Sequence, residues 1–247
     1  MPRSGNETTC LFGPVRSRRL GHSLGIDLLK FKTCTLDCAF CECGRTTQLT
    51  DTRQVFIPTE KVLQELDNFF VTQDAPEVLT FSGGGEPTLA KNLGALIRQI
   101  KRRYPSYKLC LLTNSTLLPN PQVRAEILPV DIIIPSLNAV SPKTFNQINR
   151  PLDGLTPAPI MDGLLELKKN YTGQLLLEIF IVPGVNDGEA ELAKLRDFAA
   201  QLQPDGIQLN SLDRRGAEAW VQPVSAENMQ KIKEIFKDFN TNYYLKR

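Results

Sequence analysis

Histidine is almost absent from this chain, because His22 is the one histidine among 247 residues. Metal sites built from several imidazoles, such as non-haem iron centres, are therefore excluded. Long apolar runs are missing as well: the longest, around residues 132–134, stops at Pro135, whereas a membrane-spanning helix needs about 20 apolar residues. No apolar stretch follows the basic Arg3, so we expect no signal peptide and a cytoplasmic protein without a membrane partner.

An excess of charge of either sign is also missing. The formal net charge is +2, with 41% hydrophobic and 23% charged residues, which is ordinary for a globular protein. Such a balance gives no global footprint for nucleic acid, although a local basic surface stays compatible with it. The length suits one domain. We expect a flexible arm over residues 1–12 and a single domain over residues 13–247 that ends in a helix.

Apolar segments of strand-like composition alternate along the chain with amphipathic segments of helical period. The predicted strands are residues 23–29, 78–82, 109–113, 132–137, 175–182 and 207–212. The predicted helices are residues 59–70, 89–104, 121–128, 159–171, 189–202 and 226–239. Continuous apolar runs in the later strands indicate a parallel sheet that is covered on both faces. The pattern predicts an α/β fold with right-handed crossovers, and periodicity alone allows either an open sheet or a partial barrel.

Cysteine is scarce too, with six residues that are too few and too unevenly placed for a disulfide framework. Three of them, Cys34, Cys38 and Cys41, lie in the run CTLDCAFC directly after the first predicted strand. Three thiolates at this spacing suit an iron–sulfur cubane and leave its fourth iron open to bind a substrate. The alternative is zinc, held by the Cys38–Cys41 knuckle with Cys43 or His22 as a further ligand. No second knuckle occurs in the sequence to complete a typical structural zinc site.

A glycine-rich turn, TFSGGGEPTL over residues 80–89, follows the second predicted strand. Glycines allow a backbone to approach a ligand closely, and Glu86 offers a carboxylate at the mouth of the sheet. The turn has neither the dinucleotide-binding glycine pattern nor the lysine of a phosphate-binding loop, which disfavours nucleotide phosphates. Polar residues also end later strands at the same edge, namely Asn114, Ser136 and Asn138.

The cysteine run followed by the Gly84-Gly85-Glu86 turn resembles the radical S-adenosylmethionine (SAM) superfamily. The resemblance implies a partial (β/α)6 TIM-like barrel and a [4Fe–4S] cluster, with SAM chelating the open iron. A low-potential donor of flavodoxin or ferredoxin type would reduce the cluster, and SAM would then yield a 5′-deoxyadenosyl radical. The implied cluster ligands are Cys34, Cys38 and Cys41. The implied SAM contacts are Phe40 by the adenine, Gly84, Gly85 and Glu86 at the methionine end, and Asn114, Ser136 and Asn138 at the ribose and carboxylate.

Three further segments, residues 12–34, 148–151 (INRP) and 208–216 (QLNSLDRRG), resemble one branch of this superfamily. That branch is related to wyosine-type tRNA-modifying enzymes and to nitrogenase-cofactor assembly proteins. The resemblance implies a tRNA base as one candidate substrate, and Arg16, Arg18 and Arg19 suit a grip on phosphate. The alternatives are an activase that acts on a protein glycine or another peptide residue, and a non-catalytic zinc or iron–sulfur protein. Cys43 departs from the branch, and its role stays open.

Overall fold

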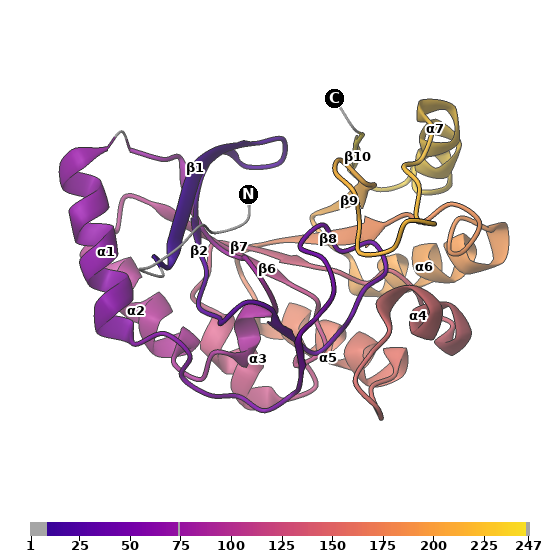
Figure 1. Ribbon diagram of the computed structural model, residues 1–247. Helices are drawn as coiled ribbons and strands as arrows, with labels where there is room; N and C mark the ends of the chain where they lie inside the picture. The colour runs from indigo at the N-terminus through magenta and orange to yellow at the C-terminus, as the bar shows by residue number, and fades with distance from the viewer. Residues whose placement is uncertain (1–8, 74, 246–247) are drawn as a thin grey trace.

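In the part of the chain that the computed structural model describes, residues 9–73 and 75–245, eight strands form one curled sheet (Figure 1). Their spatial order is β1-β2-β5-β6-β7-β8-β9-β10, in which β1 runs antiparallel to β2 and the other pairs are parallel. The strands are β1 (Leu11–Ser17), β2 (Gly21–Ile26), β5 (Val78–Phe81), β6 (Lys108–Thr113), β7 (Ile132–Pro135), β8 (Gln174–Phe180), β9 (Gly206–Asn210) and β10 (Thr241–Tyr244). A separate short pair joins β3 (Thr33–Cys34) to β4 (Gln48–Leu49).

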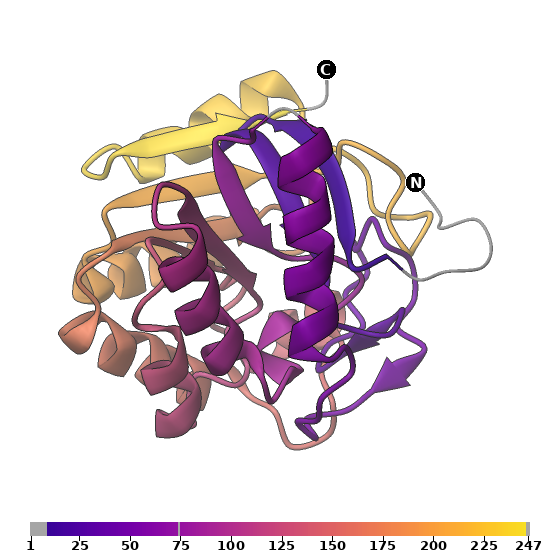
Figure 2. The ribbon, with the colours of Figure 1, turned by 90° about the vertical axis from the view of Figure 1, so that its left-hand side faces the viewer.

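Helices cover the outer face of the sheet (Figures 1 and 2). They are α1 (Thr59–Thr72), the 3-10 turn η1 (Pro87–Leu89), α2 (Leu93–Arg103), α3 (Pro121–Ile127), α4 (Pro142–Asn149), α5 (Pro157–Asn170), α6 (Glu189–Leu202) and α7 (Ala226–Ile235). Proline begins α3, α4 and α5, where its fixed φ angle suits the first helical turn. None of the helices in the described ranges is long and apolar enough to cross a membrane.

Apolar side chains form two separate clusters, one on each face of the sheet. The larger cluster packs the helices against the outer face and contains most of the buried leucine, isoleucine and phenylalanine. The smaller one, with Val78, Cys110 and Ile134, lies on the inner face of the sheet, and Leu20 packs against it. Central strands such as β5 and β7 thus bury residues on both faces, which explains the continuous apolar runs in the sequence.

The predicted α/β partial barrel is confirmed, because the six predicted strands correspond to β2 and β5–β9. In the main sheet and the helices around it, β1, α4 and β10 were missed, and so was the short β3–β4 pair. β1 contains Gly13 and Pro14, which are typical of turns, and β10 is a short segment, TNYY, with one buried position. The helix predicted to close the chain ends at Ile235, and the strand β10 follows it.

The arm expected over residues 1–12 lies, for residues 1–8, outside the described part of the chain. The rest of it is not an arm. Cys10 is 1% exposed and its carbonyl accepts a hydrogen bond from the Asp27 amide. Phe12 belongs to β1, and its ring occupies the space where Gly25 lacks a side chain. The apolar character of these residues is therefore used in packing.

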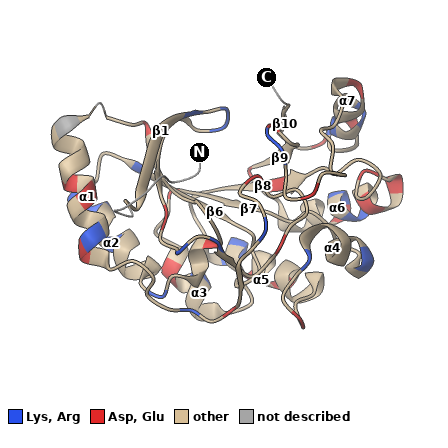
Figure 3. Ribbon diagram, in the orientation of Figure 1, with Lys and Arg blue, Asp and Glu red and all other residues tan. Residues whose placement is uncertain are grey.

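The turn of the β1–β2 hairpin reaches across the open side of the barrel toward β10 (Figure 1), and its arginines colour it blue in Figure 3. Arg18 donates to the Leu245 carbonyl and lies 3.8 Å from the Asp213 carboxylate. Arg19 forms an ion pair with Glu178 in β8. Both arginines are thus occupied within the protein, so the phosphate grip suggested by the sequence is left to Arg16, which is exposed.

Candidate functional site

The three cysteines lie together at the carboxyl edge of the parallel sheet, where active sites of this fold class are built. Cys34 is the last residue of β3, and the Cys41 amide donates to the Cys38 carbonyl at 3.1 Å in the turn that follows. Cys34 is 9% exposed, and Cys38 and Cys41 are half-buried. The loop therefore presents three thiols within one sheltered segment.

Each of the three cysteine sulfurs accepts a hydrogen bond from a nitrogen in a different place. The donors are Asn114 Nδ2 to Cys34 Sγ at 3.4 Å, Asn149 Nδ2 to Cys38 Sγ at 3.4 Å, and Lys32 Nζ to Cys41 Sγ at 3.0 Å. Donors of this kind stabilise negative charge on sulfur and tune a metal bound to it. The arrangement therefore fits three thiolate ligands, which is the chemistry that an iron–sulfur cluster requires.

His22 is not placed to act as a further ligand in the alternative zinc site. His22 lies near the amino end of β2, at the edge of the sheet opposite to the cysteine loop. Among the described residues, no three His, Cys, Asp or Glu side chains are grouped to bind one ion. Zinc needs ligands that converge on one atom at about 2.0–2.3 Å, whereas each thiolate of a cluster binds its own iron. Each of the three sulfurs has its own N–H donor, which suits thiolates that each bind a separate iron of a cluster.

The three thiols differ in their acidity. Burial raises the pKa of the Cys34 thiol to about 11, and burial also raises the pKa of Cys38. A hydrogen bond from Cys43 and the charge of Lys32 lower the pKa of Cys41. Cys41 is therefore the most acidic of the three thiols, and metal ligation requires all three to lose their protons.

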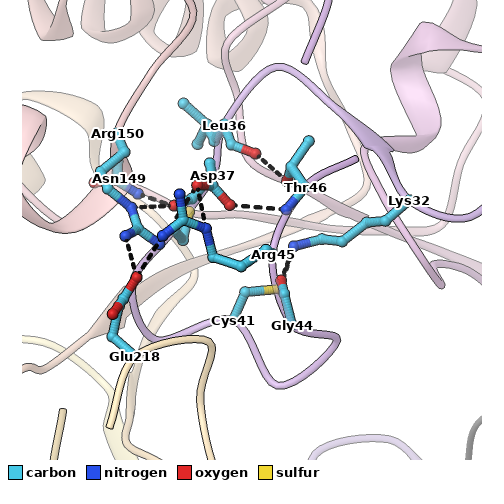
Figure 4. Close-up of polar contacts among 11 residues, drawn as sticks. Lys32, Leu36, Asp37, Cys41, Gly44, Arg45, Thr46, Asn149, Arg150 and Glu218 are labelled. Atoms are coloured by element: carbon cyan, nitrogen blue, oxygen red, sulfur yellow. Dashed lines mark hydrogen bonds and ion pairs between the residues drawn. The ribbon is translucent and has the colours of Figure 1, made fainter. Parts of the chain in front are cut away.

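The motif INRP clamps the cysteine loop from the end of α4 (Figure 4). The Asn149 carbonyl accepts from the Asp37 amide at 3.1 Å, and Arg150 Nε donates to the Asp37 carbonyl at 2.5 Å. Arg150 and Arg45 both donate to Glu218 Oε1, each at 2.6 Å. From the sequence this motif was only a family resemblance, and its contacts with the cysteine loop were not predicted.

A second clamp comes from residues 211–225, between β9 and α7, which we call the cover segment. The Glu218 amide donates to the Ala39 carbonyl at 2.9 Å. Glu42, directly after Cys41, accepts from the Arg214 amide at 3.0 Å and from the Arg214 guanidinium at 2.9 Å. The cover segment thus holds the loop at Ala39 and Glu42, and its Glu218 also accepts from Arg150 at the end of α4. It contains the LDRRG part of the segment QLNSLDRRG.

The glycine turn packs directly against the cysteine loop. A Cβ on Gly85 would lie 1.7 Å from the Thr33 carbonyl oxygen, to which the Glu86 amide donates at 3.2 Å. The Gly84 amide donates to the Asp27 carboxylate at 3.0 Å. We expected these glycines to admit a ligand, and at Gly85 the close neighbour is the backbone beside Cys34.

The Glu86 carboxylate does not stand at the mouth of the sheet as expected, because Glu86 is 1% exposed. Oε1 accepts from the Thr88 amide, the Thr88 hydroxyl and the Thr113 hydroxyl, at 3.1, 2.6 and 2.7 Å. Oε2 accepts from the Asn114 amide at 2.7 Å. Burial raises the pKa of this carboxyl, against the opposite effect of the hydrogen bonds from Thr88 and Asn114. Its side chain joins the glycine turn to the end of β6.

The remaining predicted SAM contacts surround the same edge, and most of their polar atoms have protein partners. Asn114 also donates to the Thr35 hydroxyl at 2.9 Å, so its amide faces the cysteine loop. Ser136 donates to Glu178 inside the barrel at 3.0 Å. Asn138 is 5% exposed, and its Oδ1 accepts from the Phe180 amide at 2.8 Å. Asn138 is therefore part of the frame that holds the end of β8.

Phe40 stacks on Phe180, with ring centroids 4.1 Å apart and planes inclined by 13°. This pair joins the cysteine loop to the end of β8. Gly216 of the cover segment lies so close that a Cβ there would be 3.1 Å from the Phe40 backbone. Cys43 is exposed, and its Sγ lies 3.7 Å from the Gly83 carbonyl oxygen. It therefore stands between the cysteine loop and the glycine turn.

A cavity of about 470 Å³ opens at the other end of the barrel, at the amino ends of the strands. Arg19, Lys108 and Tyr244 are among the residues that line it. It is remote from the cysteine loop, so the chemistry of the site has to be sought at the carboxyl edge.

Comparison with known proteins gives the same picture. The model of the radical SAM superfamily matches residues 28–196, which is more than half of the chain. UPF0026 protein MJ1312 of Methanocaldococcus jannaschii is 33% identical over 232 residues, covering 93% of this chain and 72% of that protein. GTPase Obg of Brachyspira hyodysenteriae is 32% identical over 235 residues, covering 95% of this chain; the chain spans only 34% of the length of that relative.

Among solved structures, archaeal TYW1 shares the fold, with a TM-score of 0.60 at 15% identity, over 89% of this chain and 72% of that one. Members of the matching superfamily use a [4Fe–4S] cluster and SAM. The curled, mostly parallel sheet is the architecture that the solved structure shares with this protein. On this evidence the chain belongs to the radical SAM superfamily.

Proposed function

We propose that this protein is an enzyme that cleaves SAM reductively and removes a hydrogen atom from a substrate bound over the carboxyl edge of the barrel. Cys34, Cys38 and Cys41 would hold the [4Fe–4S] cluster. When bound, the cluster and SAM supply an electron and a 5′-deoxyadenosyl radical. The observation that carries the proposal is the set of three N–H donors, one for each cysteine sulfur.

The residues of the chain position and protect this site. Asn149 and Arg150 fix the cysteine loop from the end of α4, and the cover segment fixes it at Glu42. The stacked Phe40 and Phe180 rings offer an apolar surface for an adenine. With its carboxylate buried, Glu86 would contact the methionine end of SAM through the backbone of residues 84–86.

Ser136 is proposed as the contact to the ribose, because its hydroxyl lies on the inside of the barrel beside Glu178. Asn114 and Asn138 are proposed to support SAM indirectly. Their side chains hold Cys34 and the end of β8 in place. Ser136 would thus touch SAM, whereas Asn114 and Asn138 would hold its surroundings in place.

The substrate proposals from the sequence are a tRNA base and a peptide or protein glycine. Arg18 and Arg19 are paired inside the protein, so RNA binding through the hairpin would rest on the exposed Arg16. Binding of tRNA that weakens steeply with added salt would support the first class. Binding that is insensitive to salt, together with hydrogen loss from a peptide, would support the second.

The reductant is proposed to be a flavodoxin or a ferredoxin, and the compartment the cytoplasm. Six cysteines remain as free thiols in the described residues, which suits a reducing environment. Reduction of the cluster by such a protein, followed optically under anaerobic conditions, tests the partner without requiring the substrate.

The central experiment is SAM cleavage by the anaerobically reconstituted protein with a strong reductant. We expect 5′-deoxyadenosine and methionine in equal amounts, and loss of both products in Cys38→Ala. Cys110→Ala is the matched control, because Cys110 lies inside the barrel and contributes nothing to the loop. A wild-type protein that holds iron and sulfide in full but releases no 5′-deoxyadenosine would contradict the proposal.

A further inference from the structure

Lys32 carries a buried positive charge next to the cysteine loop. The residue precedes β3 directly and is 2% exposed. Its Nζ donates to Cys41 Sγ at 3.0 Å and to the Gly44 carbonyl at 2.5 Å (Figure 4). Both of these hydrogen-bond acceptors belong to the cysteine loop. The ammonium is therefore anchored at the loop by a sulfur and a carbonyl, with no carboxylate partner among the ion pairs of the described residues.

A buried ammonium is stable only where negative charge or strong hydrogen bonds compensate the loss of water. Lys32 has two hydrogen-bond acceptors, the Cys41 sulfur and the Gly44 carbonyl, and of these only the sulfur can carry a full negative charge. The compensating charge is thus that of a thiolate at Cys41. Lys32 is matched to a thiolate group, and a neutral set of thiols would leave its charge uncompensated.

The three donors to the sulfurs are not equivalent. Asn114 and Asn149 are neutral amides, whereas Lys32 brings a full charge to Cys41 at a shorter distance. A fixed positive charge stabilises the reduced form of a cluster more than the oxidised form, because the reduced form carries one more negative charge. In a site sheltered from water this difference is screened only weakly.

We propose that Lys32 is a positioning residue that sets the reduction potential of the cluster by holding its ammonium against the Cys41 sulfur. This inference rests on the proposed function, in that Cys34, Cys38 and Cys41 must hold the cluster. Lys32 would make the cluster easier for the electron-donor protein to reduce. It would take no part in the binding of SAM, which the glycine turn would provide.

The test is a potentiometric titration of the reconstituted protein, with the reduced cluster followed by EPR. Lys32→Met removes both the charge and the donor, while Lys32→Gln keeps a donor without the charge. Lys30→Met is the matched control, because Lys30 lies two residues earlier and is exposed. In Lys32→Met we expect the ratio of reduced to oxidised cluster at a fixed potential to fall about tenfold, which is about 59 mV for one electron.

In Lys32→Gln we expect a smaller shift in the same direction, and in Lys30→Met none. Equal potentials in wild type and both Lys32 variants would overturn the inference while leaving the proposed function intact. Loss of the cluster from both Lys32 variants, with retention in Lys30→Met, would also overturn it and assign Lys32 to cluster retention. A wild-type protein that binds no iron and sulfide would instead defeat the proposed function itself.

Discussion

Asn149 donates a hydrogen bond to the Cys38 sulfur at 3.4 Å, across 111 positions of sequence. The donor is the last residue of α4, and the acceptor is the middle cysteine of the loop. The same residue also receives the Asp37 amide through its backbone carbonyl. One side chain and one peptide group thus tie the loop to a helix on the outer layer, which makes the position of the cysteines depend on the packing of α4.

Replacing Asn149 by alanine should weaken the hold on the loop. The side chain is buried, and its loss leaves the Cys38 sulfur without this donor, so we expect a cost of about 1–2 kcal/mol in stability. We also expect less iron per chain after reconstitution. Thermal unfolding and iron analysis measure the two effects. Asn170→Ala, at an exposed asparagine that ends α5, is the control and should change neither.

The close contact at Gly85 leaves no space for a methyl group. Gly85→Ala places a Cβ against the Thr33 carbonyl, so the two loops must separate. We expect a loss of about 3 kcal/mol, measured as the free energy of unfolding in denaturant. Gly188→Ala, where nothing lies within 4 Å of the added atom, should cost less than about 1 kcal/mol. Equal effects of the two variants would contradict the packing described for the glycine turn.

Glu86 should make the stability depend on pH in a particular direction. Its folded-state pKa is raised above 4.5 by burial, so the folded protein binds the proton more tightly than the unfolded chain does. The carboxyl therefore stabilises the fold most at low pH, and its contribution falls as pH rises from about 4.5 through the folded pKa. Glu86→Gln lacks this ionisation. The difference in unfolding free energy between wild type and variant should change in that window and be flat above it.

The same substitution has a cost that does not depend on pH. In Glu86→Gln the new amide group would face the donors of Thr88, Thr113 or Asn114, and buried donors would then lack acceptors. We expect a loss of about 2 kcal/mol at neutral pH. An unchanged midpoint of chemical unfolding would show that the carboxylate does not hold the glycine turn to β6.

Removal of the cluster should lower the thermal stability of the protein. Metal binding stabilises the state that binds it, because the unfolded chain does not hold the ligands together. We expect the melting temperature measured under anaerobic conditions to fall after treatment with a chelator and an oxidant. Reconstitution with iron and sulfide should restore it. A melting temperature that is unchanged by both treatments would argue against a resident cluster.

The parts of the site that could be predicted are those that obey a local rule. Cys34, Cys38 and Cys41 follow a strand at fixed spacing, and the glycine turn follows the neighbouring strand, so the parallel arrangement brings them to one edge. The donors Lys32 and Asn149 follow no such rule. Each is an ordinary residue in its own segment, and its contact with a sulfur appears only when the chain is folded.

The fold shows the same division. Strands with continuous apolar runs were recognised, whereas β1 and β10 alternate with polar or turn-forming residues and were not. The direction of the Glu86 side chain was also beyond the sequence, because a carboxylate next to glycines is compatible with either an exposed or a buried position. Its burial depends on a hydrogen bond from the hydroxyl of Thr113, which lies in the strand β6.

The cover segment begins well over a hundred residues after the loop that it holds, and Glu42 and Asp213 are joined across 171 positions. A ribosome makes the chain in one direction, so the cysteines leave the exit tunnel long before residues 211–225 exist. During that interval the hydrogen bonds from the cover segment to Ala39 and Glu42 cannot form. The cysteine loop therefore reaches its final, clamped position only after nearly the whole polypeptide has been made.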